Sequence, residues 1–124
     1  MKDFEKLIEI ARRKSLFDEG NDWSNGSETY LSEIKKEVDE VVEEVPKSRV
    51  CYLEDELGDV LWDYLNAVIA LEKEQGVQLS SVLKRASQKY DERVSGIESG
   101  ESWKDVKTRQ KVRLEEEQKL KSAE

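Results

Sequence analysis

The residues best suited to chemistry in this sequence are two pairs of carboxylates, each with two residues between its members. One pair is Glu37 and Glu40, and the other is Glu56 and Asp59. In a helix this spacing places both carboxylates of a pair on one face, one turn apart. The chain contains no histidine, so a metal bound by these residues would have oxygen ligands only. Oxygen ligands select hard cations, usually Mg²⁺ with Mn²⁺ as a substitute, and the pairs therefore predict a site for one or two such ions.

A solvated helix face is the alternative interpretation of each acidic pattern, because runs of charge usually face water. The helix expected to carry the second pair has apolar residues well off its main apolar stripe, including Trp62, Leu65 and Ile69. A helix that is apolar on most of its sides is a buried one. Carboxylates on a buried helix must be paired, protonated or bound to a cation, which favours the metal site.

Helical periodicity accounts for nearly the whole chain, and no segment of useful length alternates as a strand does. Glycines and the single proline, Pro46, separate the periodic segments, and Ser95 to Ser102 is expected to be a loop. A length of 124 residues is usual for one domain. We therefore expect an all-α fold of four to five helices in a single domain over residues 1–124. The expected helices cover about residues 3–18, 27–45, 48–75, 80–94 and 103–120.

The second and third helices each have an apolar stripe that is expected to face a core. On the second helix the stripe consists of Ile34, Val38, Val41, Val42 and Val45. On the third helix it consists of Val50, Leu53, Val60, Leu61, Tyr64, Val68 and Leu71. The third helix has more apolar circumference than one thin monomeric layer can cover, so we expect a homo-oligomer with a helical core. A dimer is the minimum, and a tetramer is favoured.

The charge balance excludes several classes of function. Lys and Arg number 21 against 29 Asp and Glu, and the net charge of −8 repels nucleic-acid phosphates, so no nucleic-acid partner is expected. A nucleotide would be repelled as well, unless a divalent cation and a few basic residues reverse the local field.

Cys51 is the only cysteine, so no intrachain disulfide can form. No apolar run approaches the ~20 residues that span a bilayer, and we expect a cytoplasmic protein without membrane contact.

The acidic pairs and their surroundings resemble a known family. The run from Ile34 to Val41, followed by Leu53 to Leu61 with Glu-Leu-Gly-Asp at 56–59, is similar to the MazG motif of Glu-x-x-Glu, a spacer and Glu-Leu-Gly-Asp. The resemblance covers about residues 20–94 and leaves the C-terminal helix, about 103–120, unmatched. It implies an all-α pyrophosphohydrolase that cleaves a (deoxy)nucleoside triphosphate between its α- and β-phosphates, which gives the monophosphate and pyrophosphate.

By position, the resemblance identifies Glu37, Glu40, Glu56 and Asp59 with the four Mg²⁺ ligands of the family. One of these carboxylates would also accept the proton of the attacking water; Glu40 is favoured for this role, and Glu37 is nearly as good a candidate. Lys36 stands where one common version of the motif has a glutamate. This departure leaves the four ligands intact and removes any supporting role of a carboxylate at that position.

Five further residues are candidates for substrate binding. Lys89 and Arg93 resemble basic positions that neutralise the triphosphate in the family, and Trp23 resembles a tryptophan in the loop before the first metal helix. A loop tryptophan can stack on a base or fill a core, and both interpretations stay open. Asp63 extends the acidic face by one turn and is either a support to the metal ligands or an ordinary aspartate that is exposed or paired within its helix. Asn66, one turn further, is a candidate contact to the base or sugar.

Three functions remain in view from the sequence. The leading one is a housecleaning pyrophosphohydrolase that acts on nucleoside triphosphates. The second is a dUTP or phosphoribosyl-ATP pyrophosphohydrolase of the same superfamily. The third is a non-catalytic acidic helical module that binds another protein.

Overall fold

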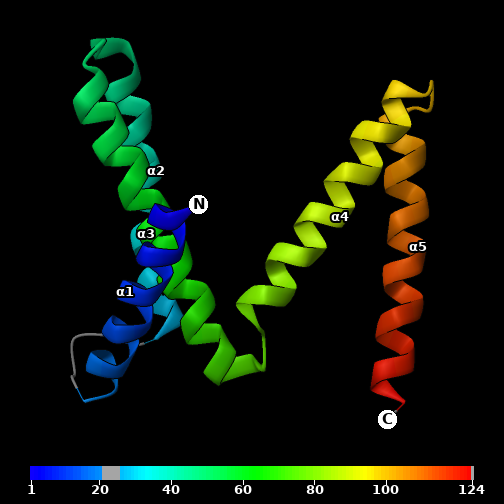
Figure 1. Cartoon of the computed structure of the whole chain (residues 1–124), viewed down its shortest axis with the longest axis horizontal. Coiled ribbons are helices and arrows are strands. Elements are labelled where there is room, and N and C mark those ends of the chain that lie inside the picture. The colour runs from blue at the N-terminus through cyan, green and yellow to red at the C-terminus, as the bar shows by residue number, and fades with distance from the viewer. Residues whose placement is uncertain (21–25, 124) are drawn as a thin grey trace. The chain divides into compact units, whose positions relative to one another are not determined.

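A computed structural model describes residues 1–20 and 26–123 of the chain. Over these residues the fold has five α-helices, one 3₁₀ helix and no strand, which confirms the all-α prediction. The elements are α1 (Lys2–Glu19), α2 (Ser27–Glu44), η1 (Val45–Lys47), α3 (Val50–Gln75), α4 (Leu79–Glu98) and α5 (Trp103–Ser122) (Figure 1). Among the described residues, no helix combines the length and the apolar character required to cross a bilayer.

The helices form two compact units, Met1–Leu79 and Ser80–Glu124. The first unit contains α1, α2 and α3, and the second contains α5 and almost all of α4. A single domain over residues 1–124 stays a prediction.

Most helix ends lie close to the predicted positions, but the end of α4 does not. The sequence placed a loop from Ser95 to Ser102, whereas α4 continues to Glu98. Gly96 therefore does not end the helix. A Cβ atom added there would lie 2.8 Å from Cγ2 of Val106, so the glycine allows α5 to approach α4 closely. The turn is made by Gly100, whose φ of +97° is in the left-handed region.

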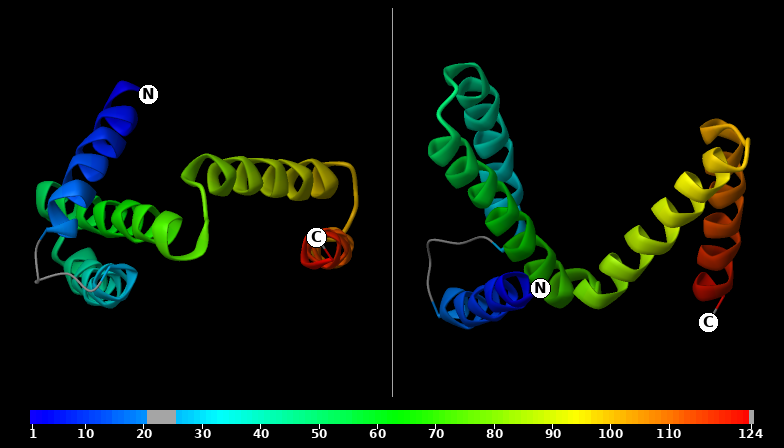
Figure 2. Two further views of the ribbon diagram at one scale, coloured as in Figure 1. Left: turned by 90° about the horizontal axis from the view of Figure 1, so that it is seen from below. Right: turned by 45° about the horizontal axis from the view of Figure 1, so that its top comes forward.

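In the first unit, α2 and α1 both pack against α3 (Figure 2). The pairing of α2 with α3 is antiparallel, because Ser27 at the start of α2 bonds to Glu74 near the end of α3. The buried core lies around the C-terminal half of α3, where α1 also packs. Its apolar members are Ala11, Tyr30, Leu65, Ala67, Val68, Ile69 and Leu79.

The apolar stripes near η1 are not buried in the single chain. Val42 is 64% exposed, Val45 57% and Val50 68%, although all three were predicted to face a core. Within one chain this prediction is wrong. The physical reason is that the buried core of the first unit surrounds the other half of α3, and no described residue of the chain covers the stripes at the η1 end. An oligomeric core stays a prediction.

Two glutamates near the C-terminal end of α3 tie the three helices of this unit together. The Glu72 carboxylate accepts hydrogen bonds from the Arg12 guanidinium, at 2.6 and 3.2 Å, and from the backbone N–H of Leu79 at 2.9 Å. Glu74 accepts from the backbone N–H of Ser27 at 2.8 Å and from its hydroxyl group. Glu74 thus satisfies a free N–H group in the first turn of α2, the role that a capping side chain normally fills.

We predict that Glu74→Ala lowers the free energy of unfolding by about 1 kcal/mol, the usual cost of removing a helix cap. Glu43→Ala is the matched control, because Glu43 is an exposed glutamate of α2. Urea-induced unfolding followed by circular dichroism measures both variants. A loss for Glu74→Ala no larger than that for Glu43→Ala would contradict the capping role.

Candidate metal centre

Three of the predicted metal ligands lie together in the first unit. One carboxylate oxygen from each of Glu37, Glu56 and Asp59 lies within 4.8 Å of the other two. Glu40 is not part of this trio, but its charge acts on all three of these carboxylates. The structure therefore brings Glu37, Glu56 and Asp59 into one cluster, with Glu40 at its edge. Below, "acidic cluster" means these four residues.

The antiparallel hairpin of α2 and α3 produces this arrangement. Glu37 and Glu40 are one turn apart on α2, and Glu56 and Asp59 are one turn apart on α3. Near the hairpin turn, Glu44 is buried and accepts two hydrogen bonds from the Arg49 guanidinium, at 2.9 and 2.7 Å. Glu44 shares the acidic face of α2, but it has an ionic partner and supports the hairpin.

Electrostatics in the acidic cluster disfavour four negative charges. Burial raises the pKa of Glu37, hydrogen bonding with Glu40 and repulsion from Glu40, Asp59 and Asp63 raise it further, and the result is about 7. The pKa of Glu56 is raised by burial and then by Glu40, Asp59 and Asp55. The pKa of Asp59 is also raised, first by burial. A positive charge placed among these groups would remove the repulsion.

Buried oxygens without partners show that the residues fit a cation. Oε2 of Glu37 and Oε2 of Glu56 are buried and accept no hydrogen bond from any described residue. A buried polar atom without a partner is costly, and native structures contain few of them. All-oxygen ligands of this kind suit Mg²⁺ or Mn²⁺. The donor set and the unsatisfied oxygens are therefore both consistent with a hard divalent cation.

Asp63 lies one turn along α3 from Asp59 and is 7% exposed. Its Oδ2 is a third buried oxygen without a partner among the described residues. Burial raises the pKa of Asp63, and the charges of Glu33 and Asp59 raise it further. The exposed-aspartate interpretation of this residue is therefore wrong, because Asp63 lies inside the first unit.

Asn66 lies one further turn along α3 and is 2% exposed. Its amide group donates to the backbone carbonyl of Trp62 at 2.9 Å. Asn66 also lines a pocket of about 170 Å³ within the first unit. The other lining residues are Ser15, Asp18, Glu19, Gly26, Tyr30, Ala70, Lys73 and Glu74.

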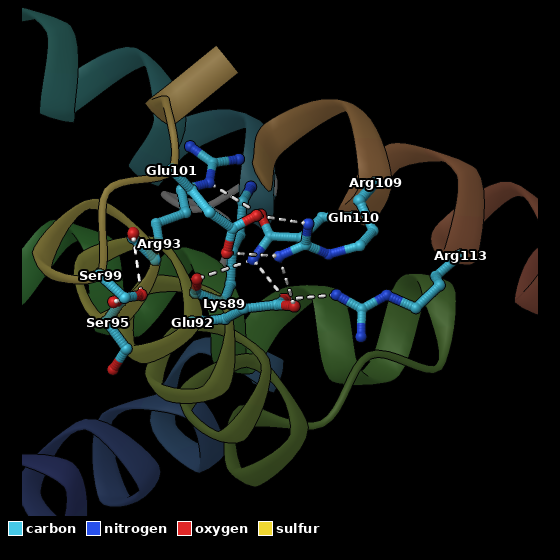
Figure 3. Close-up of polar contacts among 10 residues, drawn as sticks. Lys89, Glu92, Arg93, Ser95, Ser99, Glu101, Arg109, Gln110 and Arg113 are labelled. Carbon is cyan, nitrogen blue, oxygen red and sulfur yellow. Dashed lines mark hydrogen bonds and ion pairs between the residues drawn. The ribbon is translucent and has the colours of Figure 1, made fainter. Parts of the chain in front are cut away.

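The basic candidates lie on α4, in the second unit. Arg93 is buried, and its Nε donates to Oε1 of Gln110 at 2.8 Å (Figure 3). Lys89 is exposed, and its backbone carbonyl accepts from the amide of the same Gln110 at 2.9 Å. Gln110 of α5 was not singled out in the sequence, because nothing there showed which face of α5 meets α4. The remaining candidate, Trp23, lies outside the described residues.

Comparison with known proteins gives one match. The family model described as the MazG nucleotide pyrophosphohydrolase domain matches residues 25–96, which is more than half of the chain. The matched segment includes all four residues of the acidic cluster and ends before α5. No curated protein and no solved structure matches the chain.

The raised pKa of Glu37 predicts how the stability of the metal-free protein depends on pH. Between the ordinary value of 4.5 and about 7, the folded chain keeps a proton that the unfolded chain has released. The free energy of unfolding therefore falls as the pH rises through this range. Glu37→Gln lacks this titration. In EDTA, the melting temperature of the variant minus that of wild type should therefore increase as the pH is raised from 5 to 8. Parallel melting curves for the two proteins over this range would contradict the prediction.

Proposed function

As this chain belongs to the MazG nucleotide pyrophosphohydrolase family, we propose that it hydrolyses (deoxy)nucleoside triphosphates in a Mg²⁺-dependent reaction. The bond cleaved is the one between the α- and β-phosphates, and the products are the nucleoside monophosphate and pyrophosphate. The observation that carries this proposal is the convergence of Glu37, Glu56 and Asp59 from two helices, with buried oxygens on two of them that lack partners. A housecleaning role, in which unwanted nucleotides are removed, is part of the proposal.

Each residue of the acidic cluster has a task in this reaction. Glu37, Glu56 and Asp59 are assigned to hold Mg²⁺, with Glu40 completing the set at its edge. Bound Mg²⁺ supplies positive charge that offsets the phosphate charges and makes water a better nucleophile. Glu40 is exposed, so an attacking water molecule can reach it, and we assign it to accept the proton of that water. Glu37 is the second candidate for the residue that accepts this proton.

Asn66 and its pocket are assigned to the nucleoside end of the substrate. The pocket is smaller than the ~300–1,000 Å³ of sites that hold a whole drug-sized ligand, so it suits a single ring system. Asn66 follows Asp59 by seven residues, which is about 10 Å along the helix axis. Asp63 lies between these two residues on α3. It is assigned to contact the part of the substrate where the phosphates join the nucleoside.

We predict that Glu56→Gln and Asp59→Asn each lower turnover by more than about 100-fold, since even residues that only support metal ligands contribute 10–100-fold. Pyrophosphate release is measured with Mg²⁺ and a panel that contains the common (d)NTPs, dUTP and phosphoribosyl-ATP. Mg²⁺ should also raise the melting temperature of wild type much more than that of either variant.

Glu54→Gln is the matched control, because it removes the same charge from an exposed position on α3 and should keep wild-type turnover. A selective reaction with dUTP or phosphoribosyl-ATP would replace the broad substrate assignment. Full activity in Glu56→Gln or Asp59→Asn would remove that residue from the site. The absence of turnover on the whole panel would favour a non-catalytic acidic module.

We further propose that the exposed apolar stripes of α2 and α3 pair with a second copy of this chain. The patch lies on adjacent helices, and its members are all at least 37% exposed in the single chain. They are Val38, Val42, Val45, Val50, Leu57, Leu61 and Tyr64. Large apolar side chains left exposed on two adjacent helices, on a chain with 40% charged residues, favour an interface at this place.

We predict that wild type forms a dimer or a tetramer and that Val42→Glu shifts it toward the monomer, because a charge would be buried at the contact. Leu120→Glu is the control, since Leu120 is 72% exposed on α5, which does not contribute to this patch. Light scattering over a series of micromolar concentrations measures the mass of each protein. A wild-type monomer throughout the series, or equal masses for Val42→Glu and wild type, would contradict the interface.

A further inference from the structure

The second unit contains a basic groove that the acidic cluster does not account for. The groove lies between α4 and α5, which run antiparallel because Arg93 bonds to Gln110 while Arg85 pairs with Glu117. Its volume is about 630 Å³, within the range of small-molecule sites. The basic residues that line it are Arg85, Lys89, Arg93, Lys107, Lys111 and Arg113. We call these residues and the space between them the α4–α5 groove.

Two of these cations are already neutralised within the unit. Arg85 makes a two-point ion pair with Glu117, at 3.0 and 2.7 Å. Arg113 pairs with Glu92, which also accepts a hydrogen bond from Gln110 at 2.9 Å. The two acidic residues that line the groove therefore have their own partners.

The other four cations have no ion pair with any described residue. Lys107 and Lys111 are one turn apart on α5, and Lys89 and Arg93 are one turn apart on α4. Like charges at this spacing repel each other. These four cations make the groove locally positive on a chain whose net charge is −8.

Arg93 is the member whose side chain is held most firmly. It is only 7% exposed, and its guanidinium lies 5.2 Å from the ring centroids of both Tyr90 and Trp103. Nε donates to Gln110, but the two terminal nitrogens make no hydrogen bond with any described residue. Neither nitrogen is among the buried atoms that lack a partner, so both are open to an anion that enters the groove. The aromatic rings hold the guanidinium in place with its remaining donors unused.

We propose that the α4–α5 groove binds a condensed phosphate chain directly, without a divalent cation. Such a chain carries several negative charges in a row, which matches two cation pairs on facing helices. Arginine is well suited to phosphate because its planar guanidinium can donate two parallel hydrogen bonds. The net negative charge of the protein repels a long nucleic acid more strongly than it repels a compact anion.

This inference goes beyond the proposed function in two respects. It assigns a role to Lys107 and Lys111 of α5, which lies outside the segment that matches the family. It also requires neither the acidic cluster nor turnover. The condensed phosphate has two possible sources, a free inorganic chain such as pyrophosphate or the triphosphate group of a nucleotide.

The test is calorimetric titration of the full chain in EDTA at low salt. The probes are inorganic triphosphate, pyrophosphate, orthophosphate, a nucleoside triphosphate and a short single-stranded oligonucleotide. We expect inorganic triphosphate to bind wild type and the double variant Lys107→Gln/Lys111→Gln to bind it about tenfold more weakly or worse, since two charge-assisted contacts are lost. The control Lys104→Gln/Lys119→Gln changes the charge of α5 equally, at exposed positions outside the groove, and should bind as wild type does.

The outcomes separate this proposal from the catalytic one. Glu56→Gln should bind triphosphate in EDTA as wild type does, whether or not that residue serves turnover. Tighter binding of the inorganic chain than of the nucleotide identifies free condensed phosphate as the ligand, and equal binding identifies the nucleotide's phosphate chain. No binding in EDTA, equal affinity of the groove and control variants, or tighter binding of the oligonucleotide would overturn the proposal.

Discussion

The structure of the first unit depends on the antiparallel packing of α2 against α3, which forces carboxylates from both helices into one place. Apolar contacts and the Glu44–Arg49 ion pair hold the hairpin in this arrangement. The hairpin in turn places Glu37 beside Glu56 and Asp59, although burial and then repulsion by neighbouring carboxylates raise the pKa of each of them. The metal-free fold thus keeps an electrostatic cost in one position, and a bound cation is the simplest means of removing it.

The acidic cluster is not a by-product of a generally acidic chain, as the other end of α3 shows. Glu72 and Glu74 each have donors, and hydrogen bonds from Arg12 and from Ser27, respectively, lower the pKa of these carboxylates. The ionised form of the glutamates on α3 is therefore stabilised near the C-terminal end, where the core lies. It is destabilised near the N-terminal end, in the acidic cluster. This contrast argues against a merely solvated acidic face at Glu56, which is half-buried.

The sequence predicted the features that depend on local spacing. Helical periodicity predicted all five helices, and the two Glu-x-x-Glu/Asp pairs predicted which carboxylates share a face. The features that failed or were missed depend on contacts between helices. Gly96 was assigned to a loop because its packing against Val106 involves a different helix. Lys107 and Lys111 were missed because the sequence does not show which side of α5 faces α4.

The placement of the core has a consequence for the acidic cluster. The buried residues of the first unit surround the C-terminal half of α3, while Val42, Val45 and Val50 at the η1 end are exposed. The acidic cluster lies between these two regions along the same pair of helices. The proposed self-association would bury apolar surface on the less supported side of the cluster. Because side chains on packed helices are held more rigidly than those on exposed ones, association would also fix the spacing of the carboxylates on which metal affinity depends.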